Sequence, residues 1–177
     1  MKTSARIAVG GIFSALAVIC LCLAVIPSTE MVMPALAGFL MIPIALELGK
    51  KWAWVMYAAV SVLALIMAPI WEAKLLFILF FGYYPILKAR IEAIRKSVAE
   101  WLIKLVLFNV AMVLTYWLLL QFFHLDPEAF VIFGINMPLF VLAFGNAAFY
   151  LYDCAMTVLL TSYMNKLHPY FSRMFRK

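Results

Sequence analysis

Charged side chains are scarce in this sequence, and the common motifs for redox chemistry, metal binding and phosphate binding are missing. Only 12% of the 177 residues are Asp, Glu, Lys or Arg, against about 25% in a soluble domain. There is no CxxC pair, and neither His124 nor His168 has a second ligand at metal spacing. The phosphate-binding motifs GxxxxGK[ST] and GxGxxG are absent as well. We therefore expect no metal, no cofactor and no ATP hydrolysis by this chain alone.

Combinations of residues typical of catalytic sites are also absent from the sequence. Intramembrane proteolysis needs a Ser–His pair, paired aspartates or an HExxH zinc site, and none occurs at membrane depth. We expect no enzymatic activity. The net charge of +6 comes from loop cations and not from a recurrent basic face, so nucleic acid is not an expected partner.

Apolar residues dominate instead. They make up 68% of the chain, and its mean hydropathy is +1.08. This composition excludes a soluble domain, a disordered chain and a disulfide-stapled secreted module. About 20 apolar residues cross a hydrocarbon core of ~30 Å, so the length allows at most about six or seven helices with short loops. The sequence predicts one integral membrane domain over residues 1–177.

Six apolar segments predict an all-α, six-helix transmembrane bundle. The first is too long for a signal-peptide core and lacks a cleavage signature, so we expect it to be retained. Pro43 predicts a kink in the second segment, and Pro85 falls in the last turn of the fourth. The segments cover about Ile7–Ile26, Met31–Leu48, Trp52–Ala68, Glu72–Leu87, Trp101–Phe123 and Leu139–Met164.

Two connections are longer than turns. Lys88–Glu100 carries Ile91, Ile94 and Val98 among charges, which indicates an amphipathic interfacial helix or the end of the fourth helix continuing into water. Phe130–Met137 is apolar but too short to span the bilayer, so a re-entrant or interfacial segment is expected there.

The cations sort to one side of the predicted bundle. Of the 14 Lys and Arg residues, only Lys74 lies on the other side, where Glu30, Glu72, Asp126 and Glu128 are found. The positive-inside rule therefore predicts a multi-pass plasma-membrane protein with both termini in the cytoplasm. The cations assigned to the cytoplasmic side are Lys2, Arg6, Lys50, Lys51, Lys88, Arg90, Arg95, Lys96, Lys104, Lys166, Arg173, Arg176 and Lys177.

Asp153 is the most informative polar residue inside an apolar segment. A carboxylate at that depth costs several kcal/mol unless it is protonated, paired or hydrated. Its candidate partners at similar depth are Tyr83, Tyr84, Lys104 and Asn109. Two interpretations stay open: a polar network that locks helices together, or a proton or cation site.

A second polar set falls in the predicted outer half. It comprises Tyr116, Gln121, Asn146 and Tyr150, with Glu30 near the same surface. Asn146 and Tyr150 are four residues apart and therefore share a helix face. The set indicates either a small-molecule pocket or, for its aromatic members, an interfacial aromatic belt.

The first segment carries a stripe of small residues. Ser4, Ala8, Gly11 and Ala15 follow one another at helical spacing, which allows another helix to approach closely. Packing within the bundle and contact with a partner protein are both open at this point.

The opening TSARIAVGGIFSALAVI, a basic start followed by an alanine-rich first helix, resembles the substrate-binding S component of energy-coupling factor (ECF) vitamin transporters. The size and the six-helix layout with both ends inside match as well. The resemblance implies capture of a small, vitamin-like metabolite from outside. Uptake would be driven by a coupling transmembrane subunit and ATPase subunits.

The resemblance also implies roles for particular residues. In the family, small residues of the first helix contact the coupling subunit, and the matching positions are Ala8, Gly11 and Ala15. The family's ligand lies near the outer surface, which makes candidate contacts of Glu30, Tyr116, Gln121, Asn146 and Tyr150. Two other functions stay open: a scaffold for envelope assembly or cell shape, and a proton-coupled carrier that uses Asp153.

Overall fold

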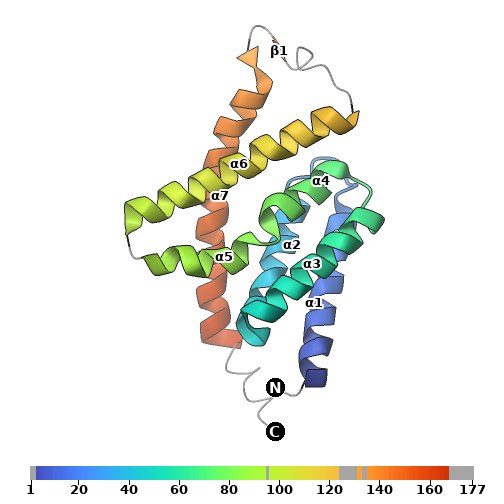
Figure 1. Cartoon of the computed structure of the whole chain (residues 1–177), viewed down its shortest axis with the longest axis vertical. Coiled ribbons are helices and arrows are strands. Elements are labelled where there is room, and N and C mark those ends of the chain that lie inside the picture. Colours follow the sequence, from blue (N-terminus) through green and yellow to red (C-terminus); the bar gives the residue numbers. More distant parts are fainter. Residues whose placement is uncertain (1–2, 95, 124–130, 133–134, 168–177) are drawn as a thin grey trace.

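The structure is a computed structural model that describes residues 3–94, 96–123, 131–132 and 135–167. Almost all of them are helical (Figure 1). The α-helices are α1 (Thr3–Leu23), α2 (Val32–Pro43), α3 (Lys50–Met67), α4 (Trp71–Leu76), α5 (Tyr84–Ile91), α6 (Ser97–Phe123) and α7 (Met137–Ser162). The π-helical turns are η1 (Ile44–Leu48), η2 (Phe77–Phe81) and η5 (Tyr163–Leu167), and η3 (Glu92–Ile94) is a 3₁₀ turn.

Four of these helices are long and apolar enough to cross a membrane. The qualifying stretches are Arg6–Leu23, Lys50–Met67, Ser97–Phe122 and Phe140–Asn165, and a shorter apolar stretch covers Val32–Leu48. Most residues in the four stretches face outward, since no more than 28% of any stretch is buried. The described part of the chain is therefore a helical, membrane-embedded protein.

The predicted kink at Pro43 takes the form of a change in helix type. Proline has no N–H to donate to the carbonyl four residues earlier, so the regular ladder stops there. The chain continues without a turn as η1, in which the helix widens from Ile44 to Leu48.

The predicted single helix over Glu72–Leu87 is wrong. The chain instead forms α4, then η2, then a turn at Gly82 and Tyr83, and α5 begins at Tyr84. Pro85 stands in the first turn of α5 and not in the last turn of the preceding helix. Its fixed φ and missing N–H suit that first turn, which explains why a new helix begins here.

The two predicted connections are described only in part. The described residues of Lys88–Glu100 form no separate interfacial helix: they divide among the end of α5, η3 and the first turn of α6. Two-residue strands, β1 (Val131–Ile132) and β2 (Ile135–Asn136), pair antiparallel just before α7. Residues 130, 133 and 134 of the segment Phe130–Met137 lie outside the described residues.

Two apolar clusters hold the helices together. The first joins α1, α2 and α3 and includes Ala17, Leu21, Met41 and Val60. The second surrounds Phe80 of η2, which packs edge-on against Phe108 of α6 and Phe149 of α7 at centroid distances of 5.3 and 5.5 Å. In Figure 1, α1 to α3 stand on one side of the molecule, and α6 crosses α7 on the other.

Candidate functional site

The sequence FFGYYPILK, residues 80–88, forms the centre of the candidate site. Its glycine, Gly82, lies against the ring of Tyr57, so closely that an added Cβ would stand 2.7 Å from two ring carbons. The chain turns there, and α5 starts at Tyr84. Tyr84 and Lys88 are four residues apart and therefore share the face of α5 that meets α7.

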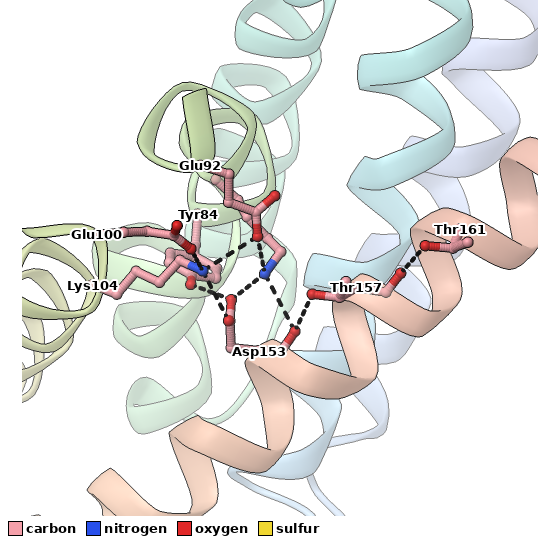
Figure 2. Close-up of polar contacts among 8 residues, drawn as sticks. Tyr84, Glu92, Glu100, Lys104, Asp153, Thr157 and Thr161 are labelled. Carbon is pink, nitrogen blue, oxygen red and sulfur yellow. Dashed lines mark hydrogen bonds and ion pairs between the residues drawn. The ribbon is translucent and has the colours of Figure 1, made fainter. Parts of the chain in front are cut away.

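Asp153 of α7 is the shared acceptor of this site (Figure 2). Its Oδ1 accepts a 2.6 Å hydrogen bond from the Tyr84 hydroxyl and a short ion pair from Lys88 Nζ. Its Oδ2 accepts from Lys104 Nζ of α6 at 2.9 Å. Asp153 is 3% exposed, so three elements surround one buried carboxylate.

Two glutamates complete the site. Glu92 Oε1 lies 2.7 Å from Lys88 Nζ and 3.2 Å from Lys104 Nζ, and Glu100 Oε1 lies 2.8 Å from Lys104 Nζ. The glutamate side chains are 36% and 20% exposed, whereas both lysines are nearly inaccessible. We call these six residues the charge cluster: Tyr84, Lys88, Glu92, Glu100, Lys104 and Asp153.

Every proton of the two buried ammonium groups has an acceptor in the charge cluster. Lys88 donates to Asp153 Oδ1, to the Asp153 backbone oxygen and to Glu92. Lys104 donates to Asp153 Oδ2, Glu92 and Glu100. An ammonium carries three donors, so both groups are saturated. Pairing of this kind compensates the large cost of burying each charge.

The structure therefore forms only part of the predicted polar network. The structure brings Tyr84, Lys104 and Asp153 together, but Tyr83 and Asn109 take different partners. Tyr83 packs edge-on against Tyr57 at 6.1 Å. Asn109 exchanges two hydrogen bonds with Asn146 of α7, at 2.8 and 3.1 Å. It lies five residues after Lys104, and Asn146 lies seven residues before Asp153.

The five predicted substrate contacts do not form one group. Asn146 is engaged by Asn109, and Tyr150 stacks on Trp101 at 5.3 Å, near the start of α6. Tyr116 is half-buried and Gln121 exposed, both further along α6, and Glu30 is exposed in the connection between α1 and α2. Tyr150 is not beside Tyr116, because the crossing of α6 and α7 sets it against Trp101.

The small-residue stripe of α1 faces outward in the structure. Ala8, Gly11 and Ala15 are exposed, and a Cβ added to Gly11 would meet nothing within 4 Å. The face of α1 that packs against the other helices instead contains Gly10 and Ser14, which are buried. At Gly10, an added Cβ would stand 2.8 Å from the Met56 side chain. The predicted stripe is thus uncovered, while Ser4 lies outside the residues whose side chains are described.

Sequence reasoning missed Lys88, Glu92 and Glu100 as members of the site. The signal was present, since Tyr84, Lys88 and Glu92 follow one another at intervals of four, as do Glu100 and Lys104. The described residues hold no group of three or more His, Cys, Asp or Glu side chains placed to bind a metal ion. No protein-family model, curated protein or solved structure matches the chain.

Proposed function

We propose that this chain is the substrate-binding membrane subunit of an ECF-type importer. It would capture a small, vitamin-like metabolite outside the plasma membrane and pass it to partner subunits that hydrolyse ATP. The observation that carries the proposal is the uncovered stripe of Ala8, Gly11 and Ala15 on α1. The absence of any nucleotide-binding motif in the sequence agrees with a dependence on partners.

A helix surface that faces lipid needs apolar side chains with enough area to contact acyl chains. Around the stripe, α1 exposes large aliphatic residues such as Ile7, Ile12 and Ile19, which suit contact with acyl chains. Small residues offer lipid little contact area, but they let the backbone of a second helix come close. An uncovered small-residue stripe therefore favours a partner helix at this surface.

On this proposal the chain crosses the membrane six times, through the four spanning helices and two shorter apolar segments. The crossings would be α1, α2 with η1, α3, the broken segment from α4 to α5, α6 and α7. α1 begins and α7 ends at the same end of the molecule in Figure 1, as both termini on the cytoplasmic side require. On this proposal the metabolite binds at the outer surface near Glu30, Tyr116 and Gln121. Asn146 and Tyr150 do not contact it, because they pair with residues of α6.

Co-purification tests the proposal. The tagged full-length protein, extracted from its native membrane in mild detergent, is expected to bring down a complex that contains ATPase subunits. Gly11→Leu fills the stripe and is expected to reduce the yield of that complex at least about tenfold. The proposal fails if the wild-type chain brings down no ATPase-bearing complex.

A matched control separates docking from folding. Ala59→Leu introduces the same bulk at an exposed position of α3. It should leave the complex intact, and both variants should keep the thermal stability of the wild type because both positions are open. Equal loss of the complex in the two variants would contradict a docking role for α1.

The saturated contacts of Asp153 weigh against the proton-coupled carrier as an alternative. Both of its carboxylate oxygens already accept from lysines or tyrosine, as a structural lock requires. The scaffold alternative is tested by ligand screening against vitamins and nucleobases. A ligand at 100 times its Kd adds about 2.7 kcal/mol to stability, a shift that a pure scaffold would not show.

A further inference from the structure

Lys74 of α4 carries a buried positive charge that no carboxylate balances. The residue is 6% exposed. Among the residues that the structure describes, every ion pair within 4.0 Å belongs to Lys88 or Lys104, and none to Lys74. The two lysines of the charge cluster share three carboxylates, whereas the groups that contact the Lys74 ammonium are neutral. Lys74 therefore differs from the other two buried lysines in having no counter-ion among the described residues.

Two neutral groups contact the Lys74 ammonium. Its Nζ donates to the backbone oxygen of Leu65 at 3.2 Å and lies 4.2 Å from the centroid of the Trp71 ring. A carbonyl dipole and an aromatic face both attract a cation, but neither carries a net negative charge. An ammonium has three N–H donors, and the bond to Leu65 uses one of them. Because buried charges in membrane proteins are normally paired, this arrangement favours a bound anion.

Lys74 lies beside the surface at which the proposed function places the metabolite. Trp71, whose ring covers the ammonium, stacks on Phe122 of α6 at a centroid distance of 5.5 Å. Phe122 directly follows Gln121, one of the predicted substrate contacts. In Figure 1, α4 lies away from the chain ends marked N and C, and Lys74 is the one cation that the sequence assigns to the outer side. An anion that arrives from outside thus meets a single positive charge here.

We propose that Lys74 is the anion-binding residue of the substrate site, and that the metabolite carries a carboxylate or phosphate group. The inference rests on the proposed function, because it takes the outer surface as the side from which the substrate arrives. The anion accepts from the remaining N–H donors of Lys74, and charge-assisted hydrogen bonds of this kind are strong. Trp71 is 37% exposed, so its ring moves aside toward solvent while Lys74 keeps its bond to Leu65.

Thermal unfolding of the full-length protein in detergent tests the site, with acetate, benzoate and inorganic phosphate as probes. The neutral amides acetamide and benzamide are the matched controls, and ionic strength is held constant with chloride. At least one of the three anions is expected to raise the unfolding temperature of the wild type in a saturable way, whereas the amides should not. Lys74→Gln removes the charge but keeps a donor for Leu65, so it should weaken binding of that anion at least about tenfold. Lys74→Arg should retain binding.

A lipid headgroup offers the same phosphate chemistry as a soluble anion, so a second arm separates the two sources. Phosphatidylglycerol and phosphatidylcholine are added to the micelles in turn, to the wild type and to Lys74→Gln. If phosphatidylglycerol stabilises the wild type more than Lys74→Gln while none of the soluble anions does, the anion is a headgroup and the proposed substrate class is overturned. Glu72→Gln, at an exposed position of α4, is the control for a general effect of charge and should bind the soluble anion at least as well as the wild type.

The chain's own carboxylates supply the remaining test. Asp126 and Glu128 follow α6 in the sequence and lie outside the described residues. The proposal is overturned if only the variant D126N/E128Q binds a probe anion, because the counter-ion of Lys74 is then internal. It is also overturned if no soluble anion stabilises the wild type, or if Lys74→Gln binds the anions equally well. Co-purification with ATPase subunits needs no bound anion, so failure of this site and failure of the proposed function give separate results.

Discussion

Three lysines are buried among the residues whose side chains the structure describes, and each supplies a hydrogen-bond donor or positive charge where the fold lacks one. Lys74 is 6% exposed and donates to the backbone oxygen of Leu65 at 3.2 Å. The usual donor to that oxygen would be the N–H four residues on, but this position is Pro69, which has none. The ammonium replaces the missing donor and suits the negative end of α3. Lys88 and Lys104 instead neutralise Asp153 in the charge cluster.

Lys88→Met is expected to destabilise the protein by about 3–5 kcal/mol, because it leaves Asp153 buried with half of its compensation. Lys96→Met, at an exposed position, should change stability by less than about 0.5 kcal/mol. Thermal or denaturant unfolding in detergent measures both. Equal stability of the two variants would show that the charge cluster contributes little.

The pair of Lys88 and Asp153 can also be tested by a double-mutant cycle. Adding Asp153→Asn to Lys88→Met removes the uncompensated charge, so the double variant should be less destabilised than the sum of the two single variants. The expected coupling is about 1–3 kcal/mol in unfolding free energy. Simple additivity would contradict a direct interaction.

Glycines provide a second residue-scale prediction. A Cβ on Gly38 would stand 2.6 Å from the backbone oxygen of Phe81, which cannot move aside, whereas one on Gly11 meets nothing within 4 Å. Gly38→Ala should therefore cost about 1–3 kcal/mol of stability, as overpacking does. Gly11→Ala should be neutral or slightly stabilising, since alanine favours helix. The reverse order of the two unfolding midpoints would contradict this packing of α2 on η2.

At the scale of elements, α6 and α7 cross through matched pairs along an antiparallel register. Phe108 stacks on Phe149 at 4.8 Å, between the Asn109–Asn146 pair and the Lys104–Asp153 ion pair. Each asparagine also donates to the backbone oxygen four residues earlier in its own helix. The pair is therefore fully satisfied, which fixes how the two helices cross.

Asn109→Leu should destabilise this crossing by about 1–2 kcal/mol, because it leaves the Asn146 amide without its partner inside the bundle. The double variant N109L/N146L should recover part of that loss, since both polar groups are then gone. Unfolding measurements on the single and double variants make the comparison. The exchange of hydrogen bonds would be contradicted if the double variant lost more unfolding free energy than the two single variants together.

The apolar helices could be predicted because length and hydropathy alone determine them, but the break in the fourth segment could not. Its position depends on how Gly82 packs on Tyr57 and on Pro85 starting α5, which periodicity does not reveal. For the same reason, the sequence places Lys88 at the start of the Lys88–Glu100 connection and does not reveal that its side chain is buried. Tyr84, Lys104 and Asp153 were predictable because buried polar groups must find partners.

The grouping of the predicted substrate contacts depends on a different assumption. Counting residues along a helix gives its depth in the bilayer only where the helices stand upright and pack evenly. The crossing of α6 and α7 instead brings Tyr150 to Trp101 and joins Asn146 to Asn109. Which residues share a depth depends on helix crossing, and a single sequence does not encode that in any local pattern.

At the scale of the whole molecule, the proposed function depends on which surface faces the cytoplasm. The charge cluster, the lysines at the starts of α3 and α6, and both ends of the chain are all assigned to the cytoplasmic side. The proposed docking of ATPase-bearing partners and the capture of a metabolite outside both follow from that assignment. An inverted protein would reverse the roles of its two surfaces.

Accessibility labelling in intact cells tests this sidedness most directly. Cys20, Cys22 and Cys154 are first replaced by serine, and single cysteines are then introduced at exposed positions 30, 50, 72 and 96. A membrane-impermeant maleimide should label positions 30 and 72 in intact cells, and positions 50 and 96 only after the cells are opened. Labelling of positions 50 and 96 from outside intact cells would contradict the account.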